Sequence, residues 1–265
     1  MSPETQGAAL VTGAGKRLGR AMALYLGGRG YDVAVHYSTS RAAAEDVVAE
    51  LKAMGRNAVS IQADLLQEHE VQSIVPATLD ALGRPLTVLV NNASIFEEES
   101  YETATRESWD RHIESNLRAP FVLLQAFAGQ VPVPLTDAEG EPLAQGLVVN
   151  MIDQRVRKVT PDFPSYTIAK MGLWAMTRTA AQGLAPKVRV NAIGPGPTLQ
   201  SIHQSDEQFA AQRGRTPLKR GASPSDILGA LGFFLDAPAV TGQLLCVDGG
   251  QHLAWQTPDV LGVDV

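Results

Sequence analysis

The sequence contains little cysteine, no excess of positive charge and no long hydrophobic run. A single cysteine, Cys246, among 265 residues excludes an intramolecular disulfide and a cysteine-rich zinc or iron–sulfur site. The formal net charge of −6 lacks the basic footprint of a duplex-binding protein, so we expect no nucleic-acid partner. No apolar run approaches the roughly 20 residues of a membrane span, and no signal-type segment opens the chain. We therefore predict a cytoplasmic protein with no membrane partner.

Histidines are also few and widely spaced. Four of them, His69, His112, His203 and His252, show no metal-ligand spacing with one another. We expect these four at the surface or in loops, and we predict no metal site.

Hydrophobic residues make up 45% of the chain and occur in short runs rich in Val, Ile and Leu. The runs lack strict polar–apolar alternation, which is typical of parallel strands buried on both faces. Stretches of helical periodicity separate them and predict βαβ units. We predict one doubly wound α/β domain over residues 1–265, with helices on both faces of a seven-stranded parallel sheet. The strands are expected at 8–12, 33–37, 58–62, 88–91, 147–151, 188–193 and 244–247.

Three segments depart from this pattern. Residues 131–146 are rich in proline and polar side chains, which predicts a surface excursion. Residues 195–220 are polar and follow the sixth predicted strand, where we expect a loop that covers the substrate. The tail, 251–265, is either a frayed terminus or, as we predict, a strap across a neighbouring subunit's site.

A glycine-rich turn, T-G-A-G-K-R-L-G at 12–19, follows the first predicted strand. Its glycines permit positive φ angles and let backbone N–H groups approach a pyrophosphate at the start of a helix. The third glycine comes one residue later than in the G-x-G-x-x-G fingerprint, so the turn alone could be only a tight turn. Its place in a doubly wound chain predicts a dinucleotide site.

Charge near the second predicted strand favours NADPH as the cofactor. An NAD-selective site has an acid near the end of that strand, and no acid occurs between Val33 and Ala44. Hydroxyl and cationic side chains suit a 2′-phosphate; the alternative is a solvated basic turn. The residues expected to gather there are Lys16, Arg17, His36, Tyr37, Ser38 and Arg41.

Tyr166 and Lys170 lie one helical turn apart, so their side chains share a face. An ammonium favours the phenolate, and we expect Lys170 to lower the pKa of Tyr166 and make it a usable proton donor or acceptor. Asp153 follows the fifth predicted strand and reaches the carboxyl edge of the sheet, where ligands bind. Two alternatives stay open. Y-x-x-x-K is common by chance, and Asp153 could form an ion pair with Arg155 or Arg157.

These motifs recur in a recognisable order along the chain. They are T-G-x-x-x-x-x-G at 12–19, Asp64, Asn91-Asn92-Ala93, Asn116, Tyr166, Lys170, Pro195-Gly196 and Asp248-Gly249-Gly250. Their order and spacing resemble the short-chain dehydrogenase/reductase family over essentially the whole length. The resemblance implies a Rossmann-like oxidoreductase, usually a homotetramer or homodimer, that moves hydride between NAD(P)H and a substrate.

The resemblance also implies a role for each matched residue. Tyr166 would be the general acid, Lys170 would bind the nicotinamide ribose and tune Tyr166, and Asn116 would hold a proton-relay water. Asp64 would bond the adenine. Further cofactor contacts are implied for Gly13, Leu18, Gly19, Leu65, Asn92, Ala93, Pro195, Gly196 and Thr198.

Three departures from the family pattern resemble its pteridine reductase branch. Arg17 replaces a middle glycine, Asp153 replaces the usual serine, and the segment after Ala93 reads Ser94-Ile95-Phe96. The branch implies that Arg17 and Ser94 contact cofactor phosphate and that Phe96 stacks on a pterin, although Phe96 could be only a hydrophobic wall. A carboxyl group at 153 can bond or protonate a nitrogen-rich ring while hydride attacks a C=N carbon.

We therefore predict an NADPH-dependent reductase of a dihydropterin, dihydromonapterin or dihydrofolate, with a proton relay through Asp153, Tyr166 and Lys170. The alternatives are a reductase of a 3-oxoacyl or sugar ketone, and a weakly catalytic NADP(H)-binding protein. Arg155, Arg157 and Lys158 follow Asp153 and could attract an anionic substrate tail, or could be a solvated charge run.

Overall fold

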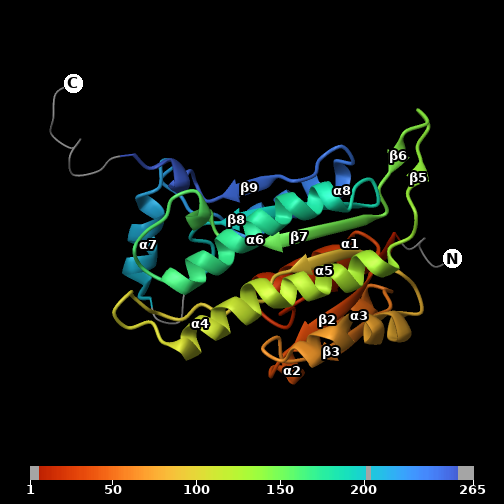
Figure 1. Ribbon diagram of the computed structural model, residues 1–265, viewed down its shortest axis with the longest axis horizontal. Coiled ribbons are helices and arrows are strands. Elements are labelled where there is room, and N and C mark those ends of the chain that lie inside the picture. The colour runs from red at the N-terminus through yellow and green to blue at the C-terminus, as the bar shows by residue number, and fades with distance from the viewer. Residues whose placement is uncertain (1–5, 201–203, 256–265) are drawn as a thin grey trace.

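Seven parallel strands form the central sheet of the computed structural model, which describes residues 6–200 and 204–255 (Figure 1). Their order across the sheet is β3-β2-β1-β4-β7-β8-β9. Their bounds are β1 Gly7–Val11, β2 Tyr31–Tyr37, β3 Ala58–Gln62, β4 Leu86–Asn91, β7 Gly146–Met151, β8 Val188–Pro195 and β9 Leu244–Val247. The predicted fold class is confirmed, and each strand lies close to its predicted position.

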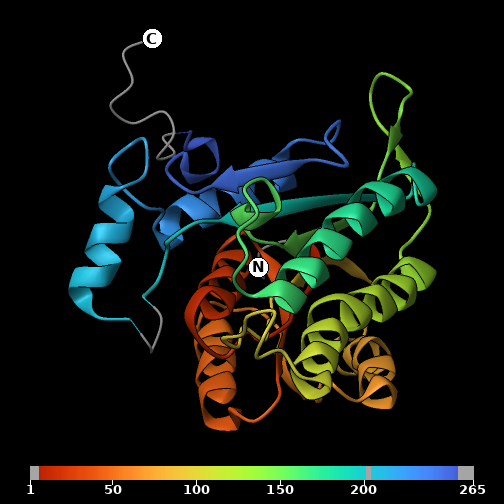
Figure 2. The ribbon, with the colours of Figure 1, turned by 60° about the vertical axis from the view of Figure 1, so that its left-hand side comes forward.

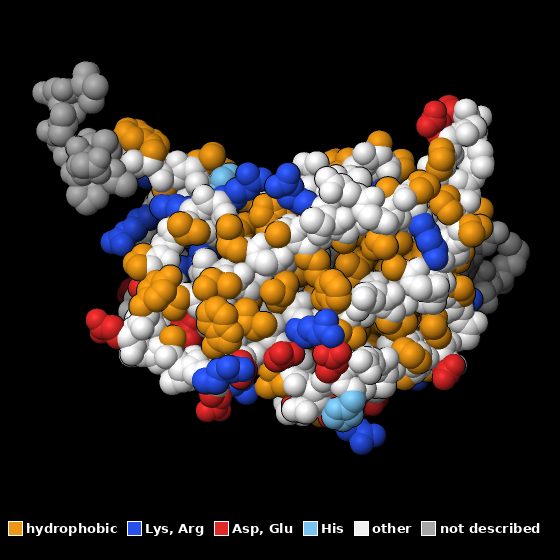
Figure 3. Space-filling view, viewed as in Figure 1, with side chains coloured by type: hydrophobic (Ala, Val, Ile, Leu, Met, Phe, Trp, Pro, Cys, Tyr) orange, Lys and Arg blue, Asp and Glu red, His pale blue; other side chains and the backbone are white. Residues whose placement is uncertain are grey.

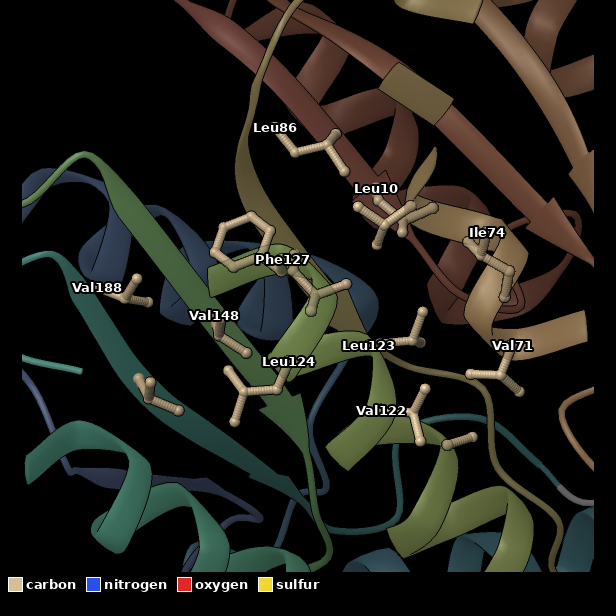
Figure 4. Packing of buried hydrophobic residues seen from close by; sticks show 14 of the residues in the cluster. Leu10, Val71, Ile74, Leu86, Val122, Leu123, Leu124, Phe127, Val148 and Val188 are labelled. Atoms are coloured by element: carbon tan, nitrogen blue, oxygen red, sulfur yellow. The ribbon is translucent and has the colours of Figure 1, made fainter. Parts of the chain in front are cut away.

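Helices cover both faces of the sheet (Figures 1 and 2). One face packs against α1, α2 and α8, and the other against α3, α5 and α6. Successive side chains of a strand serve the two cores in turn: Leu10 packs in the cluster that contains Phe127 (Figure 4), and Val11 in the cluster that contains Phe234. The helix bounds are α1 Arg17–Gly28, α2 Arg41–Ala53, α3 Glu68–Leu82, α4 Arg106–Ile113, α5 Ala119–Gln130, α6 Pro164–Gly183, α7 Asp206–Gly214 and α8 Pro224–Asp236.

The strand order reverses beside β1. From β1 the chain runs outward through β2 to β3, and then returns to β4 on the other side of β1. The loops that follow β1 and β4 therefore leave in opposite directions and open a crevice at the carboxyl edge of the sheet. This crevice is where the predicted site residues should meet.

The departing segments differ in part from expectation. The excursion at 131–146 carries a short hairpin, β5 (Leu135–Thr136) and β6 (Pro142–Leu143), which projects from the body of the molecule (Figures 1 and 2). The stretch 195–220 is not a plain loop, because Ser205 caps α7: its hydroxyl accepts the Gln208 amide at 3.2 Å. Most of the predicted strap at 251–265 lies outside the described residues.

Candidate active site

The loops after β1 and β4 are joined by Thr12. Its hydroxyl accepts the backbone N–H groups of Asn92 (2.9 Å) and Ala93 (3.0 Å), and its carbonyl accepts the Asn92 side-chain amide at 2.8 Å. Thr12 is buried, so these bonds are shielded from water. These bonds fix the glycine-rich turn and the Asn-Asn-Ala segment relative to each other at the crevice.

His36 holds the same turn from β2 and carries no charge. Its Nδ1 accepts the Gly13 amide hydrogen at 3.1 Å, so the ring hydrogen is on Nε2, which donates to the Ala63 carbonyl at 3.1 Å. Burial lowers the pKa of His36 to about 4. The expectation that His36 adds positive charge for the cofactor phosphates is therefore wrong, and its role is to anchor the turn.

Arg17 connects the glycine-rich turn to the far side of the crevice. It has a φ of 52°, a left-handed backbone conformation that suits the glycine usual at this position. Its guanidinium donates to the carbonyls of Leu199 (3.2 Å) and Gln200 (3.0 Å), in the segment after β8. Lys16, exposed beside it, is the residue directly before α1.

A cavity of about 370 Å³ lies between these loops, within the range of small-ligand pockets. Seven predicted cofactor residues line it, while Lys16, Leu18, Tyr37 and Asn92 lie on the flanking elements. Arg111 of α4 and Ser115, which follows that helix, also line it, and sequence reasoning missed both because neither belongs to a recognisable motif. The full lining is Gly13, His36, Ser38, Thr39, Asp64, Leu65, Leu66, Ala93, Ser94, Ile95, Arg111 and Ser115.

Asn116 lies in a π-helical turn, Glu114–Arg118, between α4 and α5. Its side chain is fully buried and uses both amide atoms on one residue: Oδ1 accepts the Ile95 N–H at 2.9 Å, and Nδ2 donates to the Ile95 carbonyl at 2.8 Å. Such turns are frequent at functional sites. Asn116 therefore fixes the segment that carries Ser94 and Phe96; its implied part in a water relay stays a prediction.

Asp153 and Tyr166 are in direct contact. The Tyr166 hydroxyl donates to Asp153 Oδ2 at 3.1 Å, and Oδ1 accepts the Arg155 backbone N–H at 2.8 Å. The Arg155 guanidinium turns elsewhere, to the Thr160 hydroxyl and to the Phe163 ring, 5.1 Å from its centre. The alternative of an ion pair between Asp153 and an arginine is not what the structure shows.

Burial governs the pKa values of the predicted relay. It raises the pKa of Asp153, and together with the neighbouring Asp153 carboxylate it raises the pKa of Tyr166 well above 10. It lowers the pKa of Lys170 to about 8. The Lys170 ammonium donates to the Met151 carbonyl at 2.9 Å, so the expected lowering of the Tyr166 pKa by Lys170 is wrong. Tyr166 is consequently a protonated donor aimed at a carboxylate.

Two phenylalanines form an aromatic wall beside this pair. The Phe96 ring stacks on Phe163 with centres 4.4 Å apart, and meets the Tyr166 ring edge-on at 4.8 Å. Phe96 remains half exposed, so part of its ring is accessible from solvent. Sequence reasoning missed Phe163, whose only sign is its position directly before the first proline of α6.

The histidines are not all at the surface. His112 in α4 is fully buried and bonded to Ser165 at 2.7 Å, so its predicted exposure is wrong. His69 is exposed, and His252 pairs with Asp248 at 2.8 Å; His203 lies outside the described residues. Across 6–200 and 204–255 no group of three His, Cys, Asp or Glu side chains could hold a metal ion.

The site is built from the carboxyl ends of six neighbouring strands, from β3 through β2, β1, β4 and β7 to β8. At the end of β8 the Gly196 N–H donates to the Val247 carbonyl in β9 at 3.0 Å, and the Thr198 hydroxyl donates back to the Gly196 carbonyl at 3.0 Å.

In the part of the chain that the structure describes, no helix is long and apolar enough to cross a membrane.

Comparison with known proteins identifies relatives of this chain. The family model for enoyl-(acyl carrier protein) reductase matches residues 13–252. Among curated relatives, the 3-oxoacyl-[acyl-carrier-protein] reductase FabG of Staphylococcus aureus strain Mu50 is 33% identical over 250 residues, which cover 92% of this chain and 98% of the relative. The 3-oxoacyl-[acyl-carrier-protein] reductase of Synechocystis is 33% identical over 259 residues, with 94% and 98% covered.

Solved structures give a second comparison. FolM alternative dihydrofolate reductase 1 from Brucella suis, solved with NADP, superposes with a TM-score of 0.88 at 40% identity and covers 96% of this chain and 98% of that one. A short-chain dehydrogenase from Burkholderia cenocepacia, also solved with NADP, gives a TM-score of 0.84 at 30% identity, covering 93% and 98%.

Proposed function

The chain belongs to the short-chain dehydrogenase/reductase family and is an oxidoreductase; from this premise we propose that it reduces a dihydropterin or dihydrofolate with NADPH. The observation that carries the proposal is the Tyr166 hydroxyl donating to the Asp153 carboxylate, beside the half-exposed ring of Phe96. A proton donor, a carboxylate and an aromatic surface in one place suit a flat ring rich in nitrogen.

The crevice fits NADPH. Gly13 has a φ of 61°, which lets its backbone face the crevice, and the cavity beyond it is lined by Ser38 and Thr39 without an acid from β2. Lys16 and Arg41 lie exposed beside this hydroxyl pair, where their positive charges would attract a 2′-phosphate. The NADP bound in structures 40% and 30% identical to this chain supports the same choice.

When bound, NADPH supplies the hydride. The chain's own residues then supply and transfer the proton. Tyr166 holds its proton because burial and Asp153 keep its pKa high, and Lys170 supplies the positive charge that offsets a phenolate once the proton has left. The Asp153 carboxylate can accept an N–H of the ring, or carry the proton from Tyr166 to a ring nitrogen.

A carbonyl reductase is the second candidate. The curated 3-oxoacyl-[acyl-carrier-protein] reductases, 33% identical to this chain, favour it. Tyr166 can donate one hydrogen bond to a ketone oxygen, but the residue beside it is a carboxylate, which accepts and so supplies no second donor. For that reason we place the pterin ahead of the ketone. A weakly catalytic NADP(H)-binding protein is the third candidate.

We also retain a homodimer or homotetramer in the proposal. Apolar side chains gather across the face formed by α5 and α6 (Figure 3). A groove of about 260 Å³ opens there, lined by Phe121, Leu124, Met176 and Leu184 among others. It lies apart from the Tyr166 site and is available to another subunit.

Steady-state NADPH oxidation separates the three candidates. The panel is dihydrobiopterin, dihydromonapterin, dihydrofolate, a 3-oxoacyl thioester and a sugar ketone. We expect the highest kcat/KM with a dihydropterin or dihydrofolate. Turnover of a ketone without turnover of any pterin would refute the proposal in favour of the second candidate. Saturable NADPH binding without turnover of any panel member would favour the third.

A further inference from the structure

A buried polar cluster lies behind Tyr166 and takes no part in the reaction described above. It consists of Glu99, from the segment after β4, His112 of α4 and Ser165 of α6. The side chains of Glu99 and His112 are 2% and 0% exposed, and Ser165 is 1% exposed. Polar groups at this depth persist only where they are fully hydrogen-bonded.

Glu99 caps the helix that carries Tyr166. The residue before α6, Phe163, has a φ of 58° and offers no side-chain cap. Glu99 supplies what is missing: its carbonyl accepts the Phe163 N–H at 2.9 Å, and its carboxylate accepts the Ser165 N–H at 2.7 Å. A carboxylate at this end also interacts favourably with the helix dipole. The cap therefore comes from a segment 66 residues away in the chain.

The direction of every hydrogen bond in the cluster is determined. The Glu97 N–H donates to His112 Nε2 at 3.1 Å, so the ring hydrogen lies on Nδ1 and is donated to the Ser165 hydroxyl at 2.7 Å. The Ser165 hydroxyl in turn donates to Glu99 Oε1, and the Ser108 hydroxyl donates to Oε2 at 2.7 Å. This arrangement requires an ionised Glu99 and a neutral His112.

The pKa values agree with that requirement. Burial raises the pKa of Glu99, but the hydrogen bonds from Ser165 and Ser108 outweigh it and hold the pKa below its usual value. Burial also lowers the pKa of His112. The His112 ring then packs edge-on against Tyr166, with centres 5.9 Å apart.

We propose that Glu99 is a positioning residue for Tyr166. Acting through Ser165 and His112, it fixes the start of α6 so that the Tyr166 hydroxyl faces Asp153 and Phe163 lies against Phe96. Catalytic groups lose much of their effect when they shift by an ångström, so a residue outside the crevice can govern the proton-transfer step. The inference rests on the proposed function only in taking Tyr166 as the proton donor, and it holds for a pterin or a ketone.

The kinetic test compares Glu99→Ala with Glu98→Ala, an exposed acid one residue away. It uses whichever panel substrate the wild type reduces. We expect Glu99→Ala to lower kcat by about 10- to 100-fold and to leave the KM for NADPH close to wild type. Glu99→Gln should recover most of the loss, because its amide oxygen still accepts the Ser165 N–H. If Glu99→Ala has the kcat of Glu98→Ala, the proposal is wrong.

A second variant and a structural readout guard against misfolding and against a wrong substrate. Ser165→Ala keeps the backbone cap and removes only the hydroxyl that links Glu99 to His112, so we expect a smaller fall in kcat. Nitrogen NMR of His112 in the wild type should show a neutral ring protonated on Nδ1, and amide exchange of Ser165 should accelerate in Glu99→Gln and further in Glu99→Ala. A ring protonated on Nε2, or unchanged exchange, would overturn the inference even if every candidate substrate had failed.

Discussion

The Asp153 carboxyl group helps to keep Tyr166 protonated, because it raises the pKa of the Tyr166 hydroxyl. The two oxygens are 3.1 Å apart in a buried setting, and burial raises the pKa of both groups. A serine hydroxyl at position 153 could also bond to Tyr166 and accept an N–H from a ring, but it could not take up and release a proton as a carboxyl group does.

Replacing Asp153 by serine should separate pterin reduction from cofactor binding. We expect Asp153→Ser to lower kcat with a dihydropterin by at least about 100-fold, because a positioned acid or base usually contributes at least that much. The Kd for NADPH, measured by fluorescence titration, should change little because Asp153 does not line the cofactor cavity. Unchanged pterin turnover would remove Asp153 from the mechanism.

His36 makes folding sensitive to acid. Its folded-state pKa of about 4 lies below its ordinary value of 6.5, so between these values the unfolded chain binds a proton that the folded chain does not. The free energy of unfolding should therefore fall as the pH drops from about 6.5 to about 4, by on the order of 3 kcal/mol.

Urea titrations across this pH range measure the effect. His36→Asn retains an acceptor for the Gly13 N–H but does not titrate, so its unfolding free energy should depend less on pH than that of the wild type. His69→Asn, at an exposed position, is the matched control and should keep the wild-type slope. Equal slopes in all three proteins would contradict a buried neutral His36.

At the scale of elements, α1 contains two glycines, of which only one is required by its surroundings. A Cβ at Gly19 would lie 2.2 Å from the Gly13 carbonyl oxygen and 2.6 Å from the Asn92 amide nitrogen. Nothing lies within 4 Å of a Cβ at Gly28, in the last position of the same helix. Gly19 is thus required for the close approach of the helix to the turn, and Gly28 is not.

The pair Gly19→Ala and Gly28→Ala tests this difference within one helix. Gly19→Ala should cost about 1–3 kcal/mol through overpacking and weaken NADPH binding. Gly28→Ala should be neutral or gain up to about 1 kcal/mol from helix propensity. Thermal unfolding and NADPH titration are the measurements; similar stabilities for the two variants would argue against a tight contact at Gly19.

The elements that the sequence predicts are those with a strong periodic signal. The strands are rich in Val, Leu, Ile and Ala without strict alternation because helices cover both faces of the sheet; in β1, for example, Leu10 and Val11 serve opposite cores. The π-helical turn at Asn116 has no such signal, since its bonds involve only backbone. The cap of α7 at Ser205 could have been found from Ser205 and Gln208 but was masked by the polar composition around it.

The site could be predicted where its residues share one element. Tyr166 and Lys170 lie on one helix, and the carboxyl edge of β7 brings Asp153 to them. Phe163, Arg111 and the Glu99 cluster come from segments far apart in the sequence, and only the folded packing brings them together. The pKa of Tyr166 was mispredicted for a related reason: burial outweighs a nearby charge, and burial is a property of the whole fold.

For the whole molecule, the net charge of −6 says little about its ligand. The cations proposed to meet the cofactor, Lys16, Arg17 and Arg41, lie on loops and helix starts around one crevice, while His36 among them is neutral. Two packed cores hold the sheet rigid from both faces, so residues from β1, β4 and β7 keep fixed positions at its carboxyl edge.

Hydride transfer from NADPH to a pterin can be followed directly with an isotope. The enzyme would be given a dihydropterin and NADPH that carries deuterium at its transferable position, and the product analysed by mass spectrometry and NMR. We expect one deuterium on the ring carbon of the former C=N bond. Absence of deuterium from every dihydropterin and dihydrofolate tested, with deuterium on the hydroxyl-bearing carbon of a reduced 3-oxoacyl thioester, would contradict it.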